Sequence, residues 1–191
     1  WLDALPEDCV PHTDIISELF DWLLPPLIYF VQKHVAIPSP VTAQEMAYSI
    51  MRLMTVMITN PEGLASDMPK VLEHCMIFSM IWAVGAVTDT PGREKFDIYL
   101  RKLLNDEVDE DEYHLDFLSK NRYYDIKRKA VMPLPDNGLV YDYRFDPKKS
   151  SWVSWVDSSH SHAIPKNAAF NSIVVPTIDT MRHEWLVTEV L

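Results

Sequence analysis

The sequence predicts a mainly α protein with a β extension, and three observations support this fold class. The first half repeats apolar residues every three to four positions, which is typical of helices packed on a core. From residue 132 the pattern changes to short alternating runs separated by turn residues, which is typical of strands. Residues 171–191 then predict one short strand followed by one helix. A chain of 191 residues with 48% hydrophobic content is long enough to build one sizeable core.

The first helix is expected to begin near residue 13. Residues 13–24 place apolar side chains on one broad face, and Thr13 or Asp14 is the expected N-cap. Proline lacks a backbone N–H and its ring clashes with the preceding turn of a helix. Pro25 and Pro26 are therefore expected to break or kink this helix.

Three further helices are expected before residue 105. Residues 39–58 have the clearest helical period, and the Asn-Pro-Glu-Gly run at 60–63 is expected to end that helix. Residues 68–87 are apolar nearly all round in their second half, which is typical of a central, buried helix. Residues 89–104 predict a helix with Pro91 in its first turn.

The second half divides into a charged insertion and a β region. Residues 105–116 are strongly acidic and residues 120–129 are basic, so an exposed stretch with local charge pairing is expected. Residues 139–145 alternate as a strand does. Residues 152–156 supply the expected partner strand, across a turn at 146–151.

Both ends of the sequence favour a piece of a longer polypeptide. Residues 172–176 predict a short strand, and Asp179 or Thr180 is expected to cap the helix that follows. The sequence begins on Trp1, without an initiator methionine, and stops while this strand still lacks partners. We therefore expect the last segment to be incomplete on its own.

The composition argues against several classes of partner and compartment. The formal net charge of -11 predicts a surface that repels nucleic acid and anionic lipid, so neither is an expected partner. Cys9 and Cys75 lie far apart, which favours free thiols in a reducing compartment over a disulfide scaffold. No signal peptide is expected, because the first residues contain no basic region and no apolar stretch. No membrane span is expected, because Asp21 and the Pro25-Pro26 pair interrupt the most apolar run.

No complete catalytic or ligand-binding motif occurs in the sequence. Gly85 and Gly92 have the wrong spacing for a phosphate loop, and no Lys-Ser/Thr follows them. His160 and His162, with Asp157, could offer three ligands to a metal, but such a run is more often an exposed polar loop. The acidic run lacks the glycine of a calcium loop, and no nucleophile elbow is present. The residues alone therefore predict no catalytic site.

A methionine-rich stripe on the helix expected at 39–58 leaves two interpretations open. The stripe consists of Met46, Met51, Met54 and Met57. Methionine adapts to irregular core gaps, so core packing is the simpler interpretation. The other is a face for a partner helix. That interpretation defines an alternative function, a free-standing helical protein-interaction module without catalytic activity.

Four stretches, taken in order, give the chain a resemblance to a known family. They are residues 77–104, 133–145, 152–155 and 172–186. The most specific part is the Trp-x-x-Trp pair in the third stretch, followed by Val-Pro-Thr-x-Asp-Thr-x-Arg at 175–182. This succession resembles dynein heavy chains of the axonemal type, from the small lid domain of the second AAA+ module to the start of the third. It covers nearly the whole chain apart from the charged insertion.

The resemblance implies a helical AAA+ lid-type bundle, then a β-hairpin linker, then the first strand and helix of the next AAA+ module. Residues 1–105 would form the helical lid-like domain of the second module, and residues 106–131 the charged insertion. Residues 132–170 would form the β-hairpin extension, and residues 171–191 the N-terminal segment of the third module.

The resemblance also implies positions for ligand contacts. Val175, Pro176 and Thr177 would lie near the adenine pocket of the third module, with Thr180 assisting. Arg93 could approach phosphate in the site of the second module, although charge pairing with a neighbouring carboxylate is the simpler role. This segment would contain no Walker motif, no catalytic residue and no metal ligand, so no cofactor is expected for it alone.

The implied parent is a motor ATPase that uses ATP or ADP with Mg²⁺ and moves along microtubules toward their minus ends. This segment would couple ATP-driven changes between neighbouring AAA+ modules of the same chain. The parent would contain a coiled coil and bind microtubules and dynein intermediate and light chains. It would lie in the cytoplasm, as part of the cytoskeleton that forms the axoneme of cilia or flagella. Trp152 and Trp155 would anchor the joint between modules, or be ordinary hairpin core.

Overall fold

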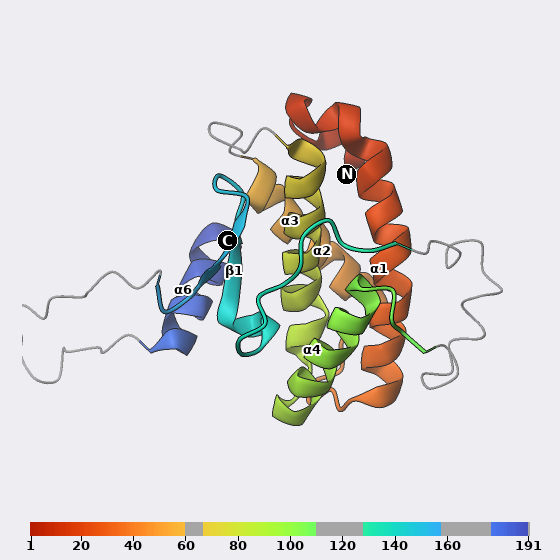
Figure 1. Cartoon of the computed structure of the whole chain (residues 1–191), viewed down its shortest axis with the longest axis vertical. Coiled ribbons are helices and arrows are strands. Elements are labelled where there is room, and N and C mark those ends of the chain that lie inside the picture. Colours follow the sequence, from red (N-terminus) through yellow and green to blue (C-terminus); the bar gives the residue numbers. More distant parts are fainter. Residues whose placement is uncertain (60–66, 110–127, 158–176, 191) are drawn as a thin grey trace, which may run out of the picture.

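Figure 1 shows a bundle of helices with a β-hairpin and a C-terminal helix against one side. This computed structural model describes residues 1–59, 67–109, 128–157 and 177–190. The bundle consists of α1 (Thr13–His34), α2 (Ala43–Ile58), α3 (Met68–Ala83) and α4 (Thr90–Leu104). The hairpin pairs β1 (Tyr143–Asp146) with β2 (Ser151–Ser154), and α6 (Ile178–Val190) follows. The predicted fold class, mainly α with a β-hairpin extension, is confirmed.

Short 3-10 helices connect these elements. They are η1 (Leu2–Ala4), η2 (Glu7–His12), η3 (Gly85–Val87) and η4 (Val140–Asp142). The first two precede α1, the third links α3 to α4, and the fourth leads into β1. The strand expected at 172–176 and most of the charged insertion lie outside the described residues.

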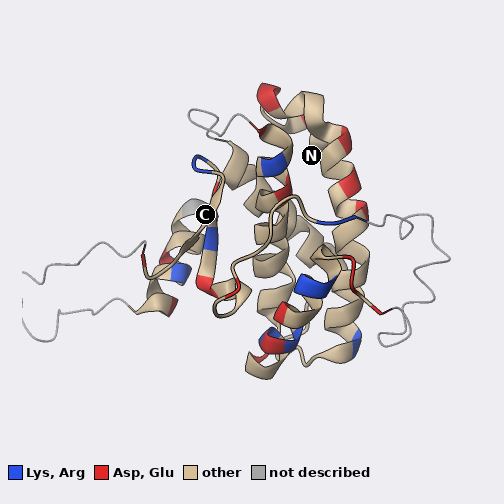
Figure 2. Ribbon diagram, viewed as in Figure 1, with Lys and Arg blue, Asp and Glu red and all other residues tan. Residues whose placement is uncertain are grey.

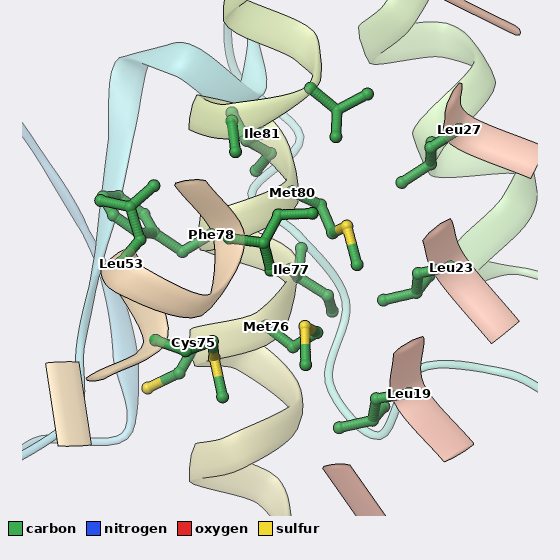
Figure 3. Packing of buried hydrophobic residues seen from close by; sticks show 14 of the residues in the cluster. Leu19, Leu23, Leu27, Leu53, Cys75, Met76, Ile77, Phe78, Met80 and Ile81 are labelled. Atoms are coloured by element: carbon green, nitrogen blue, oxygen red, sulfur yellow. The ribbon is translucent and has the colours of Figure 1, made fainter. Parts of the chain in front are cut away.

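The central helix is α3, as its all-round apolar sequence predicted. Its buried side chains face α1, α2 and the hairpin, and between Glu73 and Arg93 the sequence has only one charged residue, Asp89. Figure 3 shows Leu19, Leu23 and Leu27 of α1 pointing toward α3, one residue from each successive turn. Figure 2 likewise shows most of α3 without charge. Met68–Val87 is long and apolar enough to cross a membrane, but most of it is buried inside this fold.

The proline pair does not break α1, which corrects the sequence-based expectation. The helix continues from Thr13 to His34 through Pro25 and Pro26. Each proline removes one backbone hydrogen bond, yet the helix buries apolar side chains before and after the pair, including Leu23 and Leu27. Packing on α3 and α4 therefore holds both halves of the helix in line.

The cap predicted for α1 is wrong, whereas α2 and α4 have side-chain caps that were not predicted. Neither Thr13 nor Asp14 caps α1; the N-cap is His12, without a side-chain hydrogen bond, because η2 runs directly into the helix. In α2, by contrast, Thr42 and Glu45 form a capping box. In α4, the Asp89 carboxylate accepts from the backbone N–H of Gly92, with proline in the first turn as predicted.

Only the second half of the range predicted as a strand, residues 139–145, forms one. Residues Val140–Asp142 form η4, and β1 begins at Tyr143. The cause is local, because carboxylates rather than a neighbouring strand accept from the backbone N–H groups of Leu139 and Val140. The hairpin pairs Phe145 with Trp152 and Tyr143 with Ser154.

The methionine stripe is core. Met46 and Met54 are fully buried and Met57 nearly so, while Met51 is partly exposed. The stripe therefore packs α2 onto α3, which is the simpler of its two interpretations. It leaves little apolar methionine surface for a partner helix.

Candidate functional site

The β-hairpin and α6 join the helical bundle through a cluster of aromatic side chains. We call this cluster the aromatic joint. Its members are Phe78 and Trp82 of α3, Trp152 of β2, Trp155 just after β2, and Trp185 of α6. Segments more than a hundred residues apart in the sequence meet here, beside the centre of the bundle (Figure 1).

The rings of the joint pack mostly edge to face. Trp155 is only 2% exposed and lies with its ring centroid 6.2 Å from Trp82 and 5.9 Å from Trp185. Phe78 contacts Trp185 from the other side, at 5.5 Å between centroids. This geometry is favoured by the ring quadrupoles and adds to the gain from apolar burial. Trp155 therefore contacts both α3 and α6, whereas Trp152 packs the hairpin on α3.

A buried histidine fixes the hairpin to α3. The indole Nε1–H of Trp152 donates to Nδ1 of His74 at 3.1 Å, and Phe145 covers the imidazole at 5.3 Å between ring centroids. Burial, with a smaller contribution from the Lys70 charge, lowers the pKa of His74 to about 4. Near pH 7 the ring is therefore neutral, so Nδ1 is free to accept from Trp152.

A charged contact complements the aromatic contact of α6. The Arg182 guanidinium bonds the Asp142 carboxylate through Nη2 at 2.6 Å and Asp179 through Nη1 at 3.0 Å. Asp142 belongs to η4, so α6 is held at the base of the hairpin as well as at the joint. Arg182 is the last residue of the Val-Pro-Thr-x-Asp-Thr-x-Arg motif at 175–182.

The four residues predicted to contact adenine are only partly described. Val175 and Pro176 lie outside the described residues, whereas Thr177 and Thr180 are exposed at the start of α6. Thr177 is the cap of this helix: its Oγ1 accepts from the Thr180 backbone N–H at 3.2 Å, and the Thr180 hydroxyl accepts from the Thr177 N–H. The expected cap, Asp179 or Thr180, is thus wrong, because Thr177 caps the helix from before both residues. Asp179 pairs with Arg182 instead.

Arg93 lies at the junction of α3 and α4. Its Nη2 donates to the Ala86 carbonyl at 3.5 Å, and its guanidinium lies over the Tyr141 ring at 5.5 Å. The neighbouring carboxylates with which Arg93 was expected to pair are Glu94 and Asp97, and neither takes part in these two contacts. Asp97 is instead bound to Arg101 and to the backbone of η4.

The described residues contain no cluster of metal ligands. The proposed pair His160 and His162 lies outside them, and Asp157 is exposed. Cys9 and Cys75 are buried and free, and burial raises the pKa of both thiols. Raised thiol pKa values are the reverse of what a cysteine nucleophile requires.

Sequence reasoning missed the buried carboxylate of Glu73. Its Oε2 accepts from Arg128 Nη2 at 2.7 Å and its Oε1 from the Val131 backbone N–H at 2.6 Å. Arg128 also lies over the Trp22 ring of α1. Glu73 therefore ties the last residues of the charged insertion to α3 and α1. A lone acid inside an otherwise apolar helix was the available signal.

Replacing Glu73 with alanine should lower the free energy of unfolding by about 2 kcal/mol, because the Val131 N–H is left without its acceptor and Arg128 without its buried partner. Urea denaturation checks this value. Removing the exposed carboxylate of Asp14 is the matched control and should change stability by less than about 0.5 kcal/mol. Equal effects of the two substitutions would contradict the anchoring role.

Comparison with known proteins identifies the family. A family model described as the dynein heavy chain AAA lid domain matches residues 16–157. The chain belongs to this family. The matched range includes the bundle and the hairpin, and α6 lies beyond it. The resemblance to dynein heavy chains, inferred from the sequence motifs, is thereby confirmed.

Individual dynein heavy chains match nearly the whole chain. Dynein axonemal heavy chain 12 of Mus musculus is 30% identical over 193 residues, covering 97% of this chain and 6% of that protein. Dynein axonemal heavy chain 2 of Homo sapiens is 26% identical and covers 100% of this chain and 4% of that protein. Dynein axonemal heavy chain 3 of Homo sapiens is 24% identical, covering 97% and 5%. The lid-family chain thus spans about one twentieth of these relatives.

Proposed function

We propose that this chain is a lid and linker segment of a dynein heavy chain motor ring, from the lid of the second AAA+ module to the start of the third. In that position it couples ATP-driven changes between modules to minus-end-directed movement along microtubules in cilia or flagella. Membership of the AAA lid family and the similarity to axonemal heavy chains support the proposal.

The aromatic joint is the observation that carries the coupling role. α6 lies outside the range that matches the lid family, yet its Trp185 packs on Phe78 of the central lid helix and on Trp155. A movement of the lid as a rigid body would therefore displace α6 as well. A helix attached in this way is suited to pass domain rotation to whatever follows it in the chain.

We assign nucleotide chemistry to the parent rather than to this segment. The parent would use ATP or ADP with Mg²⁺, and Val175, Pro176, Thr177 and Thr180 would contribute to the adenine pocket of the third module. Neighbouring AAA+ modules of the same chain are the proposed direct partners. Microtubules and dynein intermediate and light chains are partners proposed for the parent, and the axoneme is its proposed location.

The size of the native polypeptide tests the proposal most simply. An antibody raised against this chain, used to blot ciliated tissue, should detect a band more than an order of magnitude heavier than 22.1 kDa, because the chain spans only 6% of a related heavy chain. A band near 22.1 kDa would instead favour the alternative, a free-standing helical interaction module.

Replacing Trp185 with alanine in the heavy chain should uncouple the motor. Loss of the contacts with Phe78 and Trp155 should slow microtubule gliding several-fold while ATP binding at the other modules is retained. Gliding velocity and ATP turnover, measured on the same preparation, check this result. Val187 on the same helix is exposed, so Val187→Ala is the matched control. Equal velocities for both variants would remove the coupling role of the joint.

A further inference from the structure

Two carboxylates hold the η4 turn between α4 and α6. The first is Asp97 of α4, which is 7% exposed and accepts from the Val140 backbone N–H at 2.8 Å. The same carboxylate binds Arg101 Nε at 3.1 and 3.2 Å, and Arg101 Nη2 reaches the Gly138 carbonyl at 3.4 Å. Asp97 and Arg101 thus bind both ends of the segment that enters the turn.

The second carboxylate, Asp142, lies at the other end of η4. Its Oδ2 accepts from the Leu139 N–H at 2.8 Å, which closes the turn, and its Oδ1 binds Arg182 of α6 at 2.6 Å. The Asp142 carbonyl also accepts from the Trp155 N–H at 3.1 Å. The turn is therefore one hydrogen-bonded unit with α4 bound on one side and α6 on the other. A side chain at Gly138 would collide with Asp142 Oδ2, 2.5 Å from the added Cβ, so glycine suits this position.

We propose that Asp97 is a positioning residue for α6 that acts through η4. The line of contacts runs from Asp97 to the Val140 N–H, through the η4 turn to Asp142, and from Asp142 to Arg182. We call these contacts, together with the bonds of Arg101 to Asp97 and to the Gly138 carbonyl, the carboxylate relay. A role of the relay in passing motion between AAA+ modules rests on the proposed function. The effect of the relay on the position of α6 is independent of that function.

The relay adds directional restraint that the aromatic joint lacks. Aromatic contacts are held mainly by apolar burial, which is non-directional, so Trp185 tolerates small shifts of α6. Charge-assisted hydrogen bonds are short and directional and lose strength steeply when they are stretched or bent. Because Asp97 is buried, its loss also leaves the Val140 N–H and Arg101 without their acceptor. The turn would then be free to move relative to α4, and α6 with it.

Amide hydrogen exchange of α6 in the 191-residue chain tests the relay. Asp97→Ala should accelerate exchange in α6 about fivefold or more, while exchange in α1 and α2 changes less than about twofold. Asp97→Asn retains one oxygen that can accept from Val140, so it should restore most of the protection. Arg182→Ala removes the bond to Asp142 and should accelerate amide exchange in α6 as much as Asp97→Ala does. The double variant should exchange little faster than either single variant.

Exposed Asp14 on α1 supplies the matched control, because Asp14→Ala should leave α6 exchange unchanged. If Asp97→Ala accelerates exchange equally in all helices, Arg101→Gln becomes the deciding variant. It removes the more exposed of the two contacts to the turn, the bond from Arg101 to the Gly138 carbonyl. Unchanged α6 exchange in Arg101→Gln, or additive effects of Asp97→Ala and Arg182→Ala, would overturn the relay. Neither result depends on ATP or microtubules, so failure of the relay leaves the proposed motor function to its own tests.

Discussion

Replacing Phe78 with alanine should lower the free energy of unfolding by about 3–5 kcal/mol, the largest effect we expect from one substitution. Phe78 is fully buried in the middle of α3, with rings of Trp82, Trp152 and Trp185 around it. Alanine would remove the apolar contacts and leave a cavity that three large, already constrained rings are poorly able to fill. The urea midpoint, followed by far-ultraviolet circular dichroism, measures the loss.

Two comparisons separate this cavity effect from a general weakness of the fold. Phe78→Leu keeps most of the side-chain volume and should lower the free energy of unfolding by less than about 1.5 kcal/mol relative to the wild type. Ile98→Ala on α4 removes an apolar side chain that is 55% exposed and should change stability by about 0.5 kcal/mol or less. If Phe78→Ala were no more harmful than Ile98→Ala, the placement of Phe78 at the centre of the joint would be wrong.

The helices could be predicted where local pattern and tertiary packing agree. The central position of α3 followed from an apolar sequence on all sides, because such a helix has to be buried on all sides. The continuity of α1 did not follow, because Pro25 and Pro26 disfavour a helix locally. What holds that helix together is contact with α3 and α4, and such long-range packing leaves no mark in the local sequence.

The site could be predicted only in part, for a similar reason. Trp152 and Trp155 were expected at a joint, but their partners on α3 and α6 depend on how distant segments meet. Glu73, His74 and Asp97 carry a signal that was overlooked: each is a polar side chain at a buried position of a helix. Buried polar side chains almost always have a hydrogen-bond partner, and here the partners are backbone or indole N–H groups in the second half of the chain.

Acidification should destabilise the fold through His74. The folded protein holds this imidazole neutral, with its pKa lowered to about 4 from 6.5, whereas the unfolded chain protonates it near 6.5. Between those two values the unfolded chain binds more protons, so lowering the pH favours unfolding. The stability from this group is fully present above about pH 6.5 and is lost progressively toward pH 4, by about 3 kcal/mol in all.

The neighbours of His74 explain why burial dominates. The Glu73 carboxylate lies close by, with Oε1 4.0 Å from Nε2, but it is already bound to Arg128 and the Val131 N–H. It is therefore poorly placed to stabilise an imidazolium, and Lys70 opposes one. Protonation would also place a proton on Nδ1, where the Trp152 indole now donates, so the hairpin would lose its attachment to α3.

Unfolding free energies of the wild type and of His74→Gln, measured from pH 7.5 to 4.5, isolate this contribution. The glutamine oxygen can still accept from Trp152 but does not titrate, so the stability advantage of the wild type should shrink steadily as the pH falls. Parallel curves for the wild type and His74→Gln would show that His74 titrates alike in the folded and unfolded states. In that case His74 would not be the buried acceptor that holds the hairpin to α3.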